Sequence, residues 1–297
     1  MKIYFAFLLA LLTINLKAQK IPEIQNSALA APTNIRIDGK ASEWGETLAA
    51  DNKRTSLLYS LANDDKNLYL VIKGIGTANI NKIMSGGITF NINLDGKKKD
   101  KESLSITYPL VKRAARGQGA GRPGMGQAAG GQARGGFGGG AGGNQNRVQL
   151  TPAQRDSVSL VNHRTQLATV KEIKIAGFKA ITDTLISIYN EFGVKAVASF
   201  DAKGAMVYEL AIPLTLLEQS IDKPKEFAYQ IKVNGLVMSG FGGAGNNGGG
   251  GAGRGGAGGF GGGFGGGFGG NGGNGGGNMQ DIMSPTDFWG KYTLIKN

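Results

Sequence analysis

Short runs in which apolar and polar residues alternate recur along most of the chain, with turn residues between them. Alternation with a period of two is typical of β-strands that bury one face. About ten short strands are therefore predicted. The runs cover residues 35–38, 55–61, 67–73, 88–94, 103–108, 170–175, 185–189, 194–200, 207–212, 227–236 and 288–295.

The residues between these runs support the same fold class. Asn63-Asp64-Asp65-Lys66 separates two runs and Asp95-Gly96 separates two others, and Asn, Asp and Gly accommodate tight hairpin turns. Thr151-Pro152 predicts the start of one short helix over residues 152–165, because a capping hydroxyl precedes a proline at the first helical position. The pattern predicts a mostly β protein, an antiparallel β-sandwich with one short helix.

Two glycine-rich stretches interrupt this pattern. Of the 52 glycines, 14 lie in residues 114–147 and 26 lie in residues 239–278. Glycine loses the most backbone entropy on ordering and has no side chain to bury, so both stretches are predicted to be long disordered insertions. The strands before the first stretch are too few to close a sandwich. We therefore predict one domain over residues 33–297, preceded by a leader over residues 19–32.

The N-terminus has the pattern of a secretory signal peptide. Lys2 precedes an apolar run from Ile3 to Ile14, and a small residue, Ala18, marks the expected cleavage site. The run is shorter than the roughly 20 residues needed to span a bilayer. We expect a signal peptide over residues 1–18, no integral membrane segment after its removal, and a secreted or periplasmic protein.

Composition narrows the chemistry further. The chain has no cysteine, which excludes disulfides and thiolate metal sites. Its formal net charge is +12, and the loss of Lys2 and Lys17 with the signal peptide would leave +10. A basic surface suggests nucleic acid, anionic lipid or acidic glycans as partners. Export argues against nucleic acid, and dispersed lysines are also typical of a plain solvated surface.

Four segments occur in an order that a known superfamily shares. They are Ile37-Asp38-Gly39-Lys40 with Glu43-Trp44, then Asn63 to Leu70, Ile88 to Asp95, and Tyr208-Glu209-Leu210-Ala211-Ile212-Pro213. In these segments the chain resembles the family 9 carbohydrate-binding-module superfamily, the DOMON-like β-sandwiches. The resemblance covers residues 33–110 and 170–236, and it does not include the predicted helix or the glycine-rich stretches.

The resemblance implies non-catalytic sugar binding, as in some members; others bind haem or have no known ligand. Sugar-binding members use a facing pair of exposed aromatic residues, and haem-binding members use Met and His ligands. His163 falls in the predicted helix rather than on a matching strand, so we expect no haem and no other cofactor. Trp44 stands where the family packs a tryptophan under the sandwich edge, and we expect it in the core. Trp289 is left open between core and sugar platform.

The residues offered as ligand-binding candidates are Trp289, Tyr292 and Tyr108. No catalytic arrangement is indicated. His163 has polar neighbours typical of an exposed histidine, whereas a catalytic base needs a carboxylate to orient it. Asp64 and Asp65 are adjacent turn residues rather than a glycosidase pair held apart across a cleft. We therefore expect no enzymatic activity.

One stretch has the spacing of a calcium loop. Asn91, Asn93, Asp95 and Glu102 place oxygens at positions 1, 3, 5 and 12 around a glycine at position 6. The first position is Asn rather than Asp, and Lys97–Lys99 add positive charge beside the cation. A plain hairpin explains every residue, and the sequence favours the hairpin, with no metal site.

Three phenylalanines, Phe260, Phe264 and Phe268, recur at intervals of four in the second glycine-rich stretch. The stretch is either a spacer, since loop-closure entropy grows slowly with length, or a weak multivalent self-association segment. The sequence favours an exported, non-catalytic binding module for a glycan or other cell-envelope polymer. The alternative is a structural protein that self-associates through its Gly/Phe-rich loops and has no small-molecule ligand.

Overall fold

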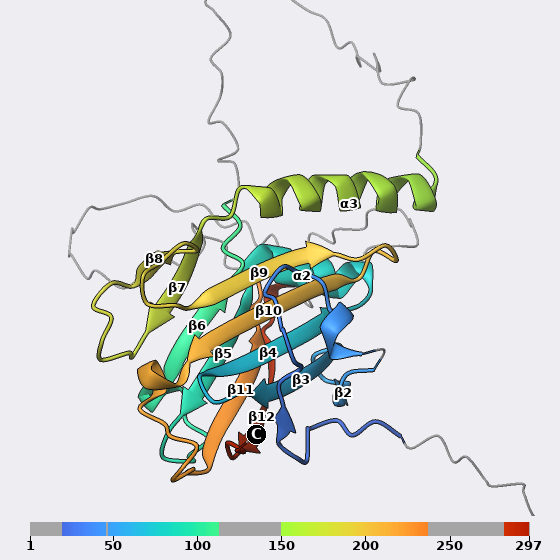
Figure 1. Cartoon of the computed structure of the whole chain (residues 1–297). Coiled ribbons are helices and arrows are strands. Elements are labelled where there is room, and N and C mark those ends of the chain that lie inside the picture. The colour runs from blue at the N-terminus through green and yellow to red at the C-terminus, as the bar shows by residue number, and fades with distance from the viewer. Residues whose placement is uncertain (1–19, 46, 113–149, 237–281, 297) are drawn as a thin grey trace, which may run out of the picture.

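The computed structural model describes residues 20–45, 47–112, 150–236 and 282–296. As predicted, this part of the chain is mostly β, with two six-stranded sheets and two α-helices (Figure 1). The first sheet contains β1 (Leu29–Ala30), β2 (Ala50–Asn52), β3 (Leu57–Asn63), β4 (Asn67–Gly74), β9 (Lys195–Phe200) and β10 (Met206–Pro213). The second contains β5 (Ile88–Asn93), β6 (Leu104–Tyr108), β7 (Glu172–Ala176), β8 (Leu185–Ser187), β11 (Phe227–Val233) and β12 (Thr286–Tyr292). The helices are α2 (Thr77–Gly86) and α3 (Pro152–Ala168).

The strand order explains which segments become neighbours. In the first sheet the order is β1-β3-β4-β10-β9, and β2 pairs with the same strand, β3, as β1 does. In the second sheet the order is β12-β11-β5-β6-β7-β8. All pairs are antiparallel except β1 with β3. The β3–β4 hairpin has the expected turn chemistry, because Asp64 Oδ1 accepts hydrogen bonds from the backbone N–H groups of Lys66 (2.7 Å) and Asn67 (2.6 Å).

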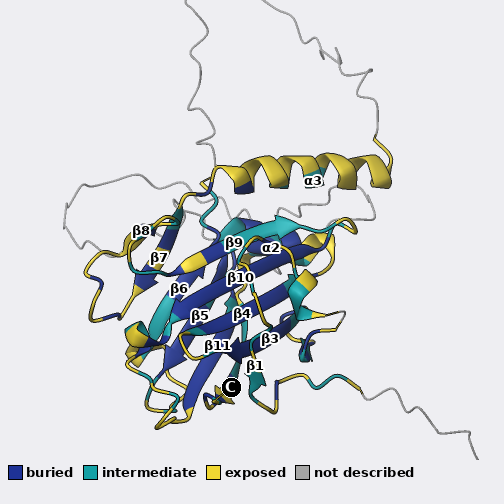
Figure 2. Ribbon diagram, in the orientation of Figure 1, coloured by how far each residue is buried: buried dark blue, intermediate teal, exposed yellow. Residues whose placement is uncertain are grey.

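The hydrophobic side chains that the two sheets turn towards each other belong to one cluster, and Figure 2 shows buried residues along the strands of both sheets. Tyr59 of β3 and Tyr229 of β11 join the two sheets through their hydroxyl groups, 2.9 Å apart. Gly290 of β12 lies under the Tyr229 ring, where an added Cβ would come within 2.3 Å of the ring carbon Cζ. A residue with a side chain cannot occupy this position without displacing the ring.

The strands that flank each glycine-rich stretch are neighbours. β6 pairs with β7, and β11 pairs with β12. Beyond the second pair, the Leu236 N–H donates to the Ile282 carbonyl over 2.8 Å. The predicted insertions lie wholly outside the described residues, as do the signal peptide and Phe260, Phe264 and Phe268. The domain boundaries remain predictions, although part of the predicted leader packs on the first sheet: the Gln25 side chain bonds both ways with the Leu61 backbone.

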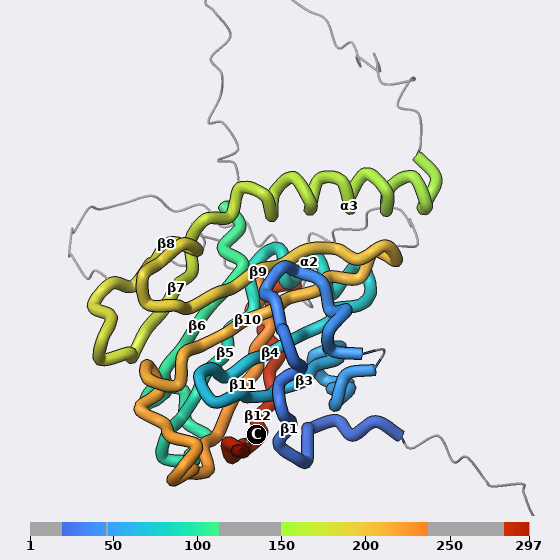
Figure 3. The backbone as a smooth tube through the Cα atoms, viewed as in Figure 1, coloured from blue at the N-terminus to red at the C-terminus, as the bar shows by residue number. Residues whose placement is uncertain are grey.

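The segment that we call the cover segment, residues 33–45, runs across the outer face of the first sheet over β4 and β10 (Figure 3). Its anchor is Glu209 of β10, which is buried. One carboxylate oxygen of Glu209 accepts the N–H groups of Asp38 (3.0 Å) and Gly39 (2.8 Å), and the other accepts the indole N–H of Trp44 (3.1 Å). Gly39 has a positive φ of 83° and lies against Ser199, so glycine suits this turn.

The prediction of a strand over residues 35–38 was therefore wrong. Ile35 and Ile37 are partly buried and Arg36 and Asp38 are exposed, so the alternation is real. It arises because the cover segment lies on top of a sheet instead of pairing at its edge. Trp44, expected in the core, is partly exposed and serves as a hydrogen-bond donor to Glu209.

Two further predictions need correction. The sequence predicted one helix, whereas the described residues contain two, and α3 extends to Ala168. The second, α2, buries Ile80, Ile83 and Met84, whose i, i+3, i+4 spacing marks one face of a helix. About ten strands were predicted, and the described residues contain twelve, including β1 and β2, which are only two and three residues long.

Candidate functional site

The outer face of the second sheet carries a row of polar residues that ends in an aromatic one. Strand pairing sets Trp289 of β12 opposite Gln230 of β11, Gln230 opposite Asn91 of β5, and Asn91 opposite Ser105 of β6. Side chains alternate along a strand, and Phe288, which precedes Trp289, packs on Tyr59 in the core. The row therefore lies on the face away from the core.

A chain of hydrogen bonds crosses this face. The Asn91 side-chain amide donates to Gln230 Oε1 (2.5 Å), and the Gln230 amide donates to Asp287 Oδ2 (2.7 Å). The other oxygen of Asp287 lies 3.7 Å from the guanidinium of Arg54, which comes from the turn between β2 and β3. Asn91 and Gln230 are buried, at 5% and 3% exposure. They hold Asp287 in place two residues from Trp289 on the same face.

The three aromatic residues predicted to bind ligand do not come together. Trp289 is partly exposed, and its indole N–H donates to no acceptor among the described residues. Tyr292 and Tyr108 are each 4% exposed and point into the core. The Tyr292 hydroxyl donates to the Leu29 carbonyl at 3.2 Å, and burial raises its pKa to about 12. Only Trp289 of the three offers part of its ring to the surface.

The residues with calcium-loop spacing are occupied by other interactions. Asn91 bonds with Gln230 on the sheet face, and Asn93 Oδ1 accepts the backbone N–H of Lys97 at 3.0 Å. Asp95 pairs with the Lys97 ammonium at 3.1 Å. Among the described residues, no group of three or more His, Asp or Glu side chains is placed to hold a metal ion. The local structure is a hairpin that Lys97 helps to close.

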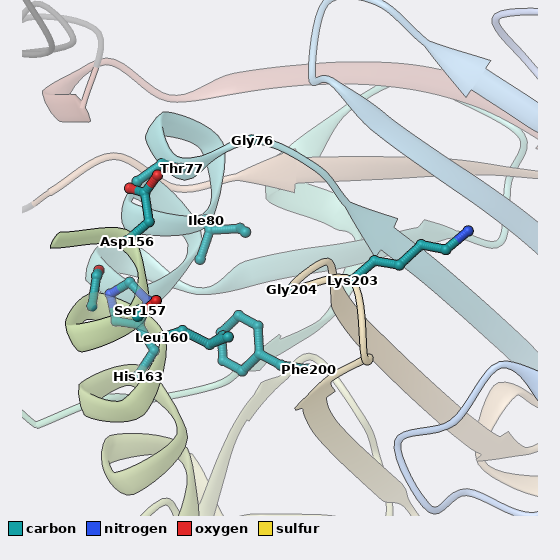
Figure 4. Close-up of a pocket in the computed structure, with 11 residues that line it drawn as sticks. Gly76, Thr77, Ile80, Asp156, Ser157, Leu160, His163, Phe200, Lys203 and Gly204 are labelled. Carbon is teal, nitrogen blue, oxygen red and sulfur yellow. The ribbon is translucent and has the colours of Figure 1, made fainter. Parts of the chain in front are cut away.

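A hollow of about 320 Å³ lies beneath α3, where this helix faces β9 and α2 (Figure 4). Its apolar wall includes Leu160, Ile80 and Phe200, and the ring of His163 stacks on Phe200 with centroids 6.0 Å apart. Burial lowers the pKa of His163. Asp156 and Thr77 also line this hollow (Figure 4), and no hydrogen bond joins Asp156 to His163 within the described residues. This arrangement lacks an oriented base.

Glu209 is the buried carboxylate that most resembles a functional group, but its contacts are structural. Burial raises its pKa, and the hydrogen bonds from Gly39, Trp44 and Asp38 offset this only in part. All three bonds fasten the cover segment to β10. Two of the motifs that carry the family resemblance, residues 37–44 and residues 208–213, therefore meet in one structural contact.

Sequence reasoning singled out Trp289 but missed the residues that fix Asp287. Asn91 was considered only as a calcium ligand, and Gln230 and Asp287 were not considered. Their signal was polar residues at the outward positions of β5, β11 and β12, which become a row only once the strand order is known.

Comparison of the chain with protein-family models, with curated proteins and with solved structures found no match. In the part of the chain that the structure describes, neither helix is both long and apolar enough to cross a membrane.

Proposed function

We propose that this protein is an exported, non-catalytic module that binds glycan chains on the outer face of its second sheet. The observation that carries the proposal is the partly exposed Trp289 on a polar sheet face, with Asp287 held beside it by Gln230 and Asn91. A signal-like N-terminus supports export.

The chemistry of the face suits a carbohydrate. The face of an aromatic ring is a large rigid apolar surface on which the C–H groups of a sugar ring can pack. A carboxylate accepts hydrogen bonds and a guanidinium donates them, so Asp287 and Arg54 can both bond sugar hydroxyls. A flat sheet face with one aromatic residue at its edge suits an extended polymer better than a small enclosed ligand.

The proposed architecture is a β-sandwich in which the two sheets are the layers. The shared hydrophobic cluster and the Tyr59–Tyr229 contact between sheets support it. So does the resemblance of residues 33–110 and 170–236 to the family 9 and DOMON-like sandwiches, in which some members bind sugars without catalysis.

Tryptophan fluorescence tests the proposal directly. The chain has two tryptophans, so Trp44→Phe leaves Trp289 as the only tryptophan emitter. Screening this variant against neutral and acidic polysaccharides is expected to give saturable changes in emission with at least one class. Trp289→Ala in the otherwise unchanged chain is expected to weaken binding of that polysaccharide by about 30-fold or more, with little effect on stability.

Tyr189→Ala is the matched control. Tyr189 is 79% exposed and follows β8, at the opposite edge of the same sheet from β12. Its removal should leave binding unchanged. The proposal would be contradicted if no polysaccharide changed the tryptophan emission, or if wild type and Trp289→Ala bound equally well.

A further inference from the structure

A small cavity of about 260 Å³ lies on the outer face of the first sheet, beneath residues 35–37 of the cover segment. Its floor is a row across three strands, in which Lys195 of β9 pairs with Ala211 of β10 and Ala211 pairs with Tyr69 of β4. Gly193 also lines it. The cavity exists because Ala211 and Gly193 leave the space between cover and sheet unfilled.

Two cations border this cavity without partners. Arg36 and Lys195 line it and are exposed, and neither forms an ion pair among the described residues. Other lysines of the described residues form ion pairs with carboxylates, such as Lys73 with Asp201 at 2.7 Å. The charge at the cavity therefore remains available to a ligand.

Asp64, whose carboxylate bonds to Tyr69, forms no ion pair with Arg36 or Lys195 among the described residues. Asp64 accepts hydrogen bonds from the Lys66 and Asn67 backbone N–H groups and from the Tyr69 hydroxyl at 2.7 Å. Its two oxygens are thus already engaged. The Tyr69 hydroxyl in turn accepts the Asn67 side-chain amide at 3.1 Å, so these polar side chains form a fixed wall.

We propose that this cavity is a binding site for a small oxyanion, held by the Arg36 guanidinium and the Lys195 ammonium. A guanidinium binds carboxylate and phosphate through two parallel N–H bonds, and an ammonium adds a point charge. The volume lies below the roughly 300–1,000 Å³ of sites for drug-sized ligands, which suits a single anionic group. The oxyanion is either the carboxylate of an acidic sugar or a free inorganic anion.

The site is independent of the glycan face. Arg36 and Lys195 lie on the first sheet, whereas Trp289 lies on the second. Loss of one site should leave the other intact, so failure of either proposal can be recognised separately.

Isothermal titration calorimetry at constant ionic strength tests the oxyanion site, with glucuronate, inorganic phosphate and neutral glucose as the probes. Saturable binding of an anion, and none of glucose, is expected. Arg36→Gln and Lys195→Gln should each weaken that binding by about tenfold. Trp289→Ala should leave it unchanged.

Arg164→Gln and Lys171→Gln are the matched controls, because they remove the same charges from exposed positions outside the cavity. They should change the affinity by less than about twofold. Binding of glucuronate alone identifies an acidic sugar, and binding of phosphate alone or of both probes identifies a general oxyanion site. No saturable anion binding, or an equal loss in the control variants, would overturn the proposal.

Discussion

The central strands of the two sheets differ from the strands β7 and β8 in the burial of their outer faces. In β4 and β10 nearly every residue is buried, on both faces, because the cover segment lies over the first sheet. In the second sheet the central strands β5 and β11 are also buried at nearly every residue, whereas buried and exposed residues alternate in β7 and β8. Strands that are covered on both faces have continuous apolar runs, and strands with one solvent-exposed face alternate between apolar and polar residues. The burial pattern of a strand therefore depends on what covers its outer face.

The two proposed sites also differ. On the second sheet, Trp289 and Asp287 are partly exposed to a ligand, whereas Asn91 and Gln230 of the polar row are buried behind Asp287. The covered face of the first sheet leaves only a small cavity, where Ala211 and Gly193 are too small to fill the space under Ile35 and Ile37. A wide surface and a small charged hollow suit different ligands.

The largest loss of stability is expected from a substitution of Glu209, which holds the cover segment on the first sheet. Glu209→Ala would leave the N–H groups of Asp38, Gly39 and Trp44 without their acceptor. Unpaired buried donors cost about 1–3 kcal/mol each, and water can reach two of the three. We expect a loss of about 3 kcal/mol in the free energy of unfolding, measured by urea denaturation, together with faster amide exchange at Asp38 and Gly39.

Glu209→Gln is the control for this change, because its side-chain carbonyl can still accept some of these bonds. It should lose about half as much stability as Glu209→Ala. If Glu209→Ala unfolds at the same urea concentration as wild type, the carboxylate does not hold the cover segment.

On the inner face of β10, a substitution of Tyr208 is expected to have the opposite effect, a gain in stability. Tyr208, next to Glu209 on β10, is fully buried, and its hydroxyl has no hydrogen-bond partner among the residues that the structure describes. Burial raises the pKa of this hydroxyl, so it stays protonated. Tyr208→Phe removes the unpaired group and keeps the ring that packs near Tyr108. We expect the variant to be more stable by about 1 kcal/mol in thermal or urea unfolding. A loss of stability would mean that the hydroxyl has a partner, such as a buried water.

The smallest effect concerns Lys73, a charged residue on the outer face of the first sheet. Its ammonium lies 2.7 Å from Asp201, a residue of the β9–β10 turn. Burial alone would raise the pKa of Asp201, but the hydrogen bonds from Lys73, Ala205 and Lys203 lower it overall. A lowered pKa stabilises the fold above the ordinary aspartate range and loses that effect as the pH falls through the folded-state value.

Asp201→Asn isolates this charge, because its side-chain carbonyl can still accept the backbone N–H groups. The variant should be less stable than wild type by about 0.5–1 kcal/mol at pH 7. The difference should shrink towards zero as the pH falls through the lowered folded-state pKa of Asp201. Unfolding curves at several pH values measure this, and a difference that is constant with pH would rule out the charge as its cause.

Most of the sheet strands could be predicted from sequence because their patterning is local. The hairpin at Asp64 and the helix start at Thr151 were predictable for the same reason, since each depends on residues within a few positions. The capping box at Thr151 and Gln154 is present, for example. The cover segment was not predictable, because its anchor, Glu209, lies far away in the sequence. Its alternation of apolar and polar residues is the same as that of a strand, and no local feature of the sequence distinguishes a cover segment from a strand.

The candidate sites divide in the same way. The opposite orientations of Trp289 and Tyr292 follow from strand alternation alone, since the two residues are three positions apart. Sequence reasoning could have recognised that both cannot face the same ligand. The Arg36–Lys195 cavity depends on the order of β4, β10 and β9 and on the path of the cover segment. Such tertiary neighbours leave no local pattern.

The pairing of β12 with β11 has a consequence for assembly. β12 is an edge strand that enters the sheet only after the connection formed by residues 237–281. Were this glycine-rich connection the disordered insertion that the sequence predicts, the effective local concentration of β12 would be on the order of 1 mM and would fall as the connection lengthens. Exchange of β12 between two copies of the chain would preserve every hydrogen bond of the pair. Domain-swapped dimers would then become competitive as the protein concentration approaches this value.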